Sequence, residues 1–177
     1  NRQGRFSHGG LVCGRHAMEN EHVHVQISPN GTLAVTHKAT GALFDGLHYF
    51  EDSGEAGMAW MHLSPANDEV ITSFDCPVTV TLEENGPLVA RYRINYSMTI
   101  PAGLDEHGGD PWKRLHGLGN AARRTTERRE LRLTSWVTLR KGARAVEVTT
   151  QFCNTAECHR LRVLFPTRLR TSRCNAE

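Results

Sequence analysis

The sequence predicts an all-β protein built as an antiparallel β-sandwich. Seven segments alternate apolar and polar residues with the period of two that half-buried strands require. Clusters of Gly, Pro, Asn and Asp separate these segments, and the short connections favour antiparallel neighbours. No segment carries a helical stripe of apolar residues over about ten positions. The 177 residues are enough for one domain with its own core, or for a part of a larger one.

The first two strands form a β-hairpin within residues 21–36. A two-residue turn would pair Ile27 with Ala34, which splits the apolar side chains between the two faces. A three-residue loop, with Gly31 in the left-handed conformation, instead pairs Ile27 with Leu33. We predict the three-residue loop because it leaves all the apolar side chains on one buried face.

Five further strands follow, with turn signals between most of them. They are predicted over residues 78–82, 88–100, 130–139, 145–152 and 159–165. Residues 1–20 are glycine-rich and aperiodic, so we expect an irregular lead-in, followed by a single β-sandwich domain over residues 21–177. Two connections, at about 45–75 and 101–126, are too long for hairpins. Loops of that length are usually functional or disordered.

Charge and cysteine content exclude several classes of protein. A net charge of +2 does not indicate a nucleic-acid partner. The arginine-rich residues 123–132 include Glu127 and Glu130 but no aromatic residue, so we expect a solvated loop and strand edge there. A helix that spans a bilayer needs about 20 consecutive apolar residues, and no apolar run here approaches that length. We therefore expect no membrane partner. The five scattered cysteines are an odd number, which indicates reduced thiols in a cytoplasmic protein.

The ten histidines require a test for a metal site. The predicted hairpin places His37 on the apolar face, whereas His22 and His24 point to the other face, so these three cannot share an ion. Cys153 and Cys158 have no second pair of ligands elsewhere, and we expect buried thiols there. No metal site is predicted in this chain.

Three motifs, in the same order along the chain, carry a resemblance to a known family. They are residues 18–43, MENEHVHVQISPNGTLAVTHKATGAL; residues 50–70, FEDSGEAGMAWMHLSPANDEV; and residues 154–167, NTAECHRLRVLFPT. Together they resemble the C-terminal β-domain of glycoside hydrolase family 38 α-mannosidases, in particular the bacterial branch. The resemblance implies part of a larger β-region, a super-sandwich similar to galactose mutarotase.

The same resemblance places the chemistry outside this chain. It implies that the nucleophilic Asp and the zinc ligands, including a His-x-Asp motif, belong to an N-terminal catalytic domain. None of the ten histidines here lies in such a motif. We therefore expect no catalytic residue and no cofactor in this chain, zinc in the catalytic domain, and that domain and a carbohydrate substrate as partners.

The candidate substrate-binding residues lie in the second and third motifs. They are Trp60, Asp52, Asp68, His159, Arg160 and Arg162. The resemblance implies a Tyr at the position of Trp60, in a segment that approaches the active-site cleft, although Met58-Ala59-Trp60 replaces the Asp-Glu-Tyr common in bacterial relatives. Trp60 either stacks on a sugar ring or packs in the core.

The charged residues of these motifs have alternative roles. Arg160 and Arg162 share one strand face, and we expect them to bind carboxylates of residues 50–70 in preference to sugar. Glu51, Asp52 and Glu55 are candidates for a glycosidase carboxylate pair, but their adjacency in sequence does not define a spacing. We expect them to cap turns or to bind arginines.

These expectations lead to one function and two alternatives. The chain is expected to be a non-catalytic part of a retaining, zinc-dependent α-mannosidase-like enzyme, inactive by itself, that supports the hydrolysis of terminal α-mannosides. The first alternative is an independent carbohydrate-binding or interaction module that uses Trp60 or Trp112. The second is a mutarotase-like enzyme, which would need a His and a Glu on one concave face.

Overall fold

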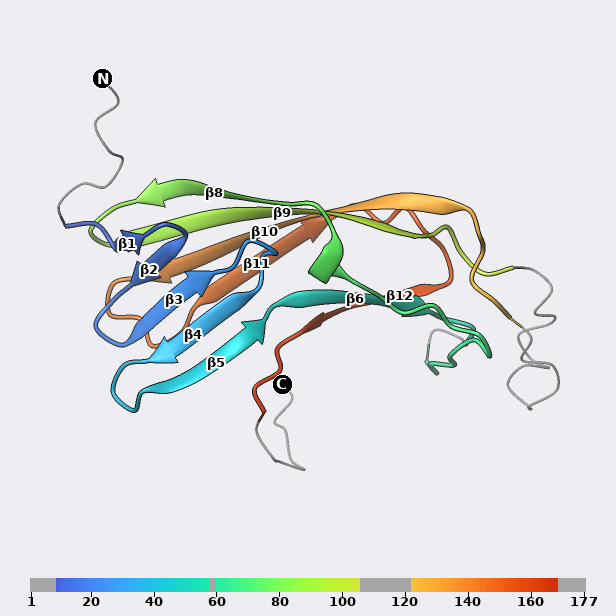
Figure 1. Cartoon of the computed structure of the whole chain (residues 1–177), viewed down its shortest axis with the longest axis horizontal. Helices are drawn as coiled ribbons and strands as arrows, with labels where there is room; N and C mark the ends of the chain where they lie inside the picture. Colours follow the sequence, from blue (N-terminus) through green and yellow to red (C-terminus); the bar gives the residue numbers. More distant parts are fainter. Residues whose placement is uncertain (1–8, 58–59, 106–121, 169–177) are drawn as a thin grey trace, which may run out of the picture.

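Two antiparallel sheets stacked face to face enclose the core, and a third continues from one of them (Figure 1). The computed structural model describes residues 9–57, 60–105 and 122–168. Its regular structure is nearly all antiparallel sheet, so the predicted fold class is confirmed. Among these residues, no helix is long and apolar enough to cross a bilayer.

The sheets contain strands that are mostly neighbours in sequence. The first has the order β1 (Val12–Gly14), β2 (Ala17–Glu19), β3 (Val23–Ile27), β4 (Leu33–His37) and β5 (Ala42–Leu47). The second has the order β11 (Glu147–Phe152), β10 (Arg128–Arg140), β9 (Val89–Pro101) and β8 (Val78–Asn85). The third has the order β12 (His159–Leu164), β6 (Tyr49–Gly54) and β7 (Ile71–Thr72), followed by the 3-10 turn η1 (Ser73–Asp75). All seven predicted strands are present.

The core lies between the inner faces of the first two sheets. Alternate residues of β9 are buried from Ala90 to Ile100, as the period of two predicts. They pack in one cluster with side chains of the first sheet such as Met18, Val25 and Ile27. Burial of each large apolar side chain contributes about 1.5 to 3 kcal/mol, so this interface is the main source of stability.

The predicted register of the first hairpin is confirmed. Ile27 lies opposite Leu33, Val23 lies opposite His37, and Gly31 has a φ of 83°. The structure adds a second reason for this glycine, which is the close approach of Tyr96 of β9. The Tyr96 hydroxyl donates a hydrogen bond of 2.8 Å to the Gly31 carbonyl oxygen. A Cβ at Gly31 would lie 2.4 Å from the Tyr96 ring, so a side chain does not fit.

Two predictions about irregular segments were wrong. The lead-in expected over residues 1–20 contains β1 and β2, which are only three residues each and therefore too short to show a period. The long loop expected at about 45–75 contains the end of β5, all of β6 and β7. Strand β6 escaped prediction because it buries the polar residues Asp52 and Ser53, so apolar residues do not alternate along it.

The second long connection, at about 101–126, is described at its two ends. Residues 106–121 lie outside the described residues. The ends pair with each other: the Asp105 N–H donates to the Arg123 carbonyl at 2.8 Å, and Leu104 bridges to Arg124. This pairing brings Arg124 toward β6.

His48 joins the first sheet to the third. It lies between β5 and β6 with a φ of 62°, is fully buried, and its backbone N–H donates to the Leu164 carbonyl at 2.8 Å. The Tyr96 hydroxyl donates to Gly31, so His48 Nδ1–H donates to the Tyr96 oxygen, 3.2 Å away. The Nε2 atom has no hydrogen-bond partner among the residues that the structure describes. Burial lowers the pKa of His48 to about 4, so the ring is neutral at pH 7.

Replacement of Gly31 tests the close contact with Tyr96. We expect Gly31→Ala to lower the free energy of unfolding by about 2 to 5 kcal/mol, because it adds a steric clash to an unfavourable positive φ. Gly41→Ala is the matched control, since Gly41 also has a positive φ but no atom near the added Cβ. It should cost about 1 to 2 kcal/mol in urea unfolding. Equal losses would contradict the role of Tyr96.

The buried His48 predicts a stability that depends on pH. Between pH 6.5 and about 4 the unfolded chain binds a proton at this position that the folded chain does not bind. His48 should therefore lower the free energy of unfolding by up to about 3 kcal/mol as the pH falls through this range. His48→Asn, which tolerates the positive φ, should have a shallower dependence in urea titrations at several pH values. Parallel curves would contradict this role.

Candidate functional site

A buried ion-pair cluster lies where β6, β12, the 55–70 loop and residues 122–125 meet. Asp52, on the inward face of β6, is fully buried. Its Oδ1 accepts a hydrogen bond of 2.5 Å from Arg124 Nη2, and its Oδ2 lies 2.5 Å from Nδ1 of His159 on β12. The side chains of Arg124 and His159 are 2 % and 5 % exposed, so both contacts are shielded from water.

The second nitrogen of His159 is also engaged. Nε2 lies 2.8 Å from the side-chain oxygen of Asn154, and the same oxygen accepts the N–H of Ala156 at 3.2 Å. His159 is thus held between Asp52 and Asn154, and together with Arg124 its ring faces the buried carboxylate.

Asp68 connects the cluster to the 55–70 loop. Its Oδ1 accepts the N–H of Gly54 at 2.9 Å and lies 3.8 Å from Arg124 Nη1, which also donates to the Glu69 carbonyl at 3.3 Å. A Cβ at Gly54 would lie 2.5 Å from Pro65 Cγ, so the loop packs directly on the end of β6. The cluster therefore clamps both ends of the loop.

The two predicted arginines, Arg160 and Arg162, lie on the other face of the third sheet. Arg162 pairs with Glu51, which lies directly opposite it, as predicted. Arg160 lies opposite Ser53 on the same face. The carboxylate of Asp52 binds Arg124 instead of either arginine of β12.

Glu55 organises the loop itself. Its side chain accepts the N–H groups of Gly57 at 2.8 Å and Leu63 at 2.9 Å, and it pairs with His62. Partial burial alone would raise the pKa of Glu55, but the Leu63 and Gly57 N–H groups and the His62 ring lower it below its ordinary value. Each of the three acids considered for a glycosidase pair is therefore engaged by protein groups, as expected.

Trp60 lies on the outside of this loop. Its side chain is 82 % exposed, and Met61 beside it is 41 % exposed, so the alternative of a core tryptophan is wrong. The loop after β6 lies at the opposite end of the molecule from β1 (Figure 1). The aromatic ring is thus available for contact beyond the chain.

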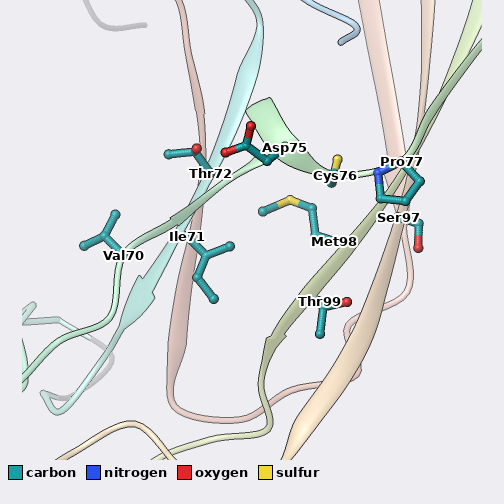
Figure 2. A pocket seen from close by; sticks show the side chains of 9 residues that line it. All are labelled: Val70, Ile71, Thr72, Asp75, Cys76, Pro77, Ser97, Met98 and Thr99. Atoms are coloured by element: carbon teal, nitrogen blue, oxygen red, sulfur yellow. The ribbon is translucent and has the colours of Figure 1, made fainter.

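A separate cavity of about 380 Å³ lies between β7, η1 and β9 (Figure 2). Its wall is formed by Val70, Ile71, Thr72, Asp75, Cys76, Pro77, Ser97, Met98 and Thr99. Met98 points from β9 toward β7, and hydroxyl groups lie around it. None of the six candidate residues lines this cavity, so it is distinct from the ion-pair cluster.

The cysteines differ from the prediction. Cys153 and Cys158 are exposed, where buried thiols were expected. Cys13 and Cys76 are also free, in agreement with reduced thiols in the described part of the chain.

Comparison with known proteins identifies the family. A model of the Glycosyl hydrolases family 38 C-terminal domain matches residues 18–177. The chain belongs to this family. It is 32% identical over 150 residues to a protein of Halalkalibacterium halodurans named "Putative mannosylglycerate hydrolase", covering 84% of this chain and 17% of that protein.

Solved structures of family 38 proteins agree with this assignment. An alpha-mannosidase from Enterococcus faecalis V583 matches 94% of this chain with a TM-score of 0.84 and 32% identity. A family 38 protein from Enterococcus faecalis gives the same score and identity. The chain covers 19% and 20% of those two structures, so it corresponds to about a fifth of the family 38 proteins that it matches.

Arg124 is the central residue of this family 38 domain that sequence reasoning missed. It lies 72 positions from Asp52, in an arginine-rich run that predicted a solvated loop. The bridge of Asn67 to Arg123, together with that of Leu104 to Arg124, fixes the position of this segment. Nothing in a single sequence distinguishes Arg124 from the arginines beside it.

Asp52→Asn tests the clamp. The substitution leaves the charge of Arg124 buried without its partner, so we expect a loss of about 3 to 5 kcal/mol in the free energy of unfolding. Glu51→Gln is the matched control on the neighbouring position, where Arg162 is 43% exposed, and it should cost at most about 1 kcal/mol. Chemical denaturation measures both, and similar losses would contradict a special role for Asp52.

Proposed function

We propose that this chain is a non-catalytic β-sandwich part of an α-mannosidase-like glycoside hydrolase. It supports the hydrolysis of terminal α-mannosides by a zinc-dependent, retaining catalytic domain outside these 177 residues, in a cytoplasmic enzyme. The observation that carries this proposal is the match of residues 18–177 to a C-terminal domain, in a chain whose motif acids are bound to protein groups.

The carboxylates of residues 50–70 that bind protein groups favour a non-catalytic role over a catalytic one. A retaining glycosidase needs two carboxyl groups about 5 to 5.5 Å apart with the substrate between them. Asp52 is buried and bound to Arg124 and His159, and Glu51 is paired with Arg162. Asp52 and His159 thus hold the loop, and the loop presents Trp60.

Exposed apolar surface supports a partner within the same protein. A groove of about 330 Å³ opens between β4, β5 and β11 and is lined by Leu33, Val35, Phe44, Leu47, Val146, Val148, Phe165 and Thr167. Val163 of β12 and Phe165, which follows the end of this strand, are each 46% exposed. Contiguous apolar surface of this kind is typical of a packing interface.

The exposed Trp60 also favours the alternative of a carbohydrate-binding module. Tryptophan rings stack on the apolar faces of sugars, and an 82% exposed ring is accessible. Trp112, the other residue considered for this role, lies outside the described residues. The two functions differ in one respect. A carbohydrate-binding module binds sugar as an isolated chain, whereas a supporting domain contacts only substrate that the catalytic domain holds.

Activity of the isolated chain tests the main proposal. The purified 177-residue chain should not hydrolyse an aryl α-mannoside, and mannose should not change its tryptophan fluorescence. Hydrolysis would contradict the proposal. Saturable quenching that Trp60→Ala abolishes would instead support the binding module.

Trp60→Ala in the full-length enzyme tests the role of the loop. We expect kcat/KM for an aryl α-mannoside to fall about tenfold, the equivalent of one aromatic stacking contact of about 1.5 kcal/mol. Leu88→Ala is the control, because Leu88 is 64% exposed on the β8–β9 turn. Mannosylglycerate is a second test substrate, given the name of the Halalkalibacterium relative. Unchanged kcat/KM for both substrates would contradict the proposed role of Trp60.

A further inference from the structure

The outer face of β1, β2 and β3 brings three potential metal ligands together. Val12 and Met18 point into the core, so the residue that follows each of them, Cys13 and Glu19, points outward. Glu19 lies directly opposite His24 of β3, which also points away from the core. Cys13 lies at the irregular step of the β1–β2 pairing.

The ligand atoms of these residues converge. One sulfur, one carboxylate oxygen and one imidazole nitrogen, from Cys13, Glu19 and His24, lie within 4.8 Å of one another. Ligands at about 2.0 to 2.3 Å from a tetrahedral ion are separated by about 3.5 Å, so small side-chain rotations would close the site. All three residues are exposed or half-buried and are free to make these rotations.

We propose that Cys13, Glu19 and His24 bind a divalent transition-metal ion of the zinc class, with water in the fourth position. The combination of sulfur, oxygen and nitrogen donors indicates which metal would bind. A thiolate and an imidazole favour zinc or cobalt over magnesium or calcium, which prefer oxygen ligands alone. Three protein ligands with one open position match the coordination number of zinc.

Lys38, the first residue after β4, orients the carboxylate of this site. Its Nζ lies 2.7 Å from Glu19 Oε2. A carboxylate has two oxygens, so one can accept from Lys38 while the other binds the ion, as is usual for metal-binding carboxylates whose outer partners fix their orientation.

The proposed site gives His24 two further metal ligands, which the predicted hairpin alone did not provide. His24 could not share an ion with His37, which lies opposite Val23. Its partners come instead from β1 and β2, the two short strands that the sequence did not predict. A bound ion would cross-link these three-residue strands to β3, so it should also stabilise the fold.

Titration of the full-length protein with Co²⁺ tests the proposal. A thiolate ligand produces a near-ultraviolet charge-transfer band, which a catalytic site without cysteine does not produce. We expect a saturable band that Zn²⁺ displaces. Cys13→Ser should abolish the band, and Glu19→Gln and His24→Gln should weaken Co²⁺ binding at least about tenfold. Each position is exposed or half-buried, so the variants should fold.

The chain offers a control for each ligand. Cys153→Ser removes another exposed thiol, and Glu21→Gln and His22→Gln alter the same residue types near the site but outside the cluster. These variants should retain the band and its affinity. Zn²⁺ should raise the melting temperature of the wild type more than that of Cys13→Ser. The absence of a band, or a band that persists in Cys13→Ser, would overturn the proposal.

Discussion

The buried carboxylate of Asp52 is the group on which the arrangement of the 50–70 segment depends. It is fully buried in β6, and an unpaired charge in that environment would be strongly destabilising. Arg124 and His159 compensate it from two segments distant in sequence, and Asp68 extends the cluster into the loop. Since each partner comes from a different element, the network holds β6, β12 and the loop in one geometry. A buried ion pair of this kind provides specificity of structure more than stability.

A second buried polar contact aligns the two sheets of the sandwich. The Tyr96 hydroxyl of β9 donates to Gly31 in the first hairpin and accepts from His48, where the first sheet continues into the third. Burial raises the pKa of Tyr96 and lowers that of His48, so both remain neutral at pH 7. The hydrogen bond between these neutral groups therefore joins the two sheets without burying a charge.

The surface of the domain has three regions that differ in their side chains. One end presents Trp60 on a clamped loop, while the groove beside β11 exposes apolar side chains. The outer face of β1 to β3 carries thiol, carboxylate and imidazole groups together. A domain that supports catalysis by a neighbour requires the first two features, a presented contact residue and a packing surface. The third is independent of that role and would strengthen the part of the sheet with the shortest strands.

The sequence by itself determined the fold class, the register of the first hairpin and the family, because each depends on local information. Alternation with a period of two defines a strand, and Gly31 permits the turn that keeps Ile27 and Leu33 on one face. The pairing of Arg162 with Glu51 was also predictable in kind, since both motifs could be placed on the sheet.

Only the tertiary structure decided which charged groups meet. Strand β6 has no apolar alternation because its buried positions include Asp52 and Ser53, and the partners of Asp52 lie far away in sequence. Arg124 resembles every other arginine of its run until the 122–125 segment is placed beside β6. Cys13, Glu19 and His24 likewise converge only when two three-residue strands are added to the sheet. Ion pairs and ligand clusters depend on distances between residues far apart in sequence, and such distances leave no periodic pattern in a single chain.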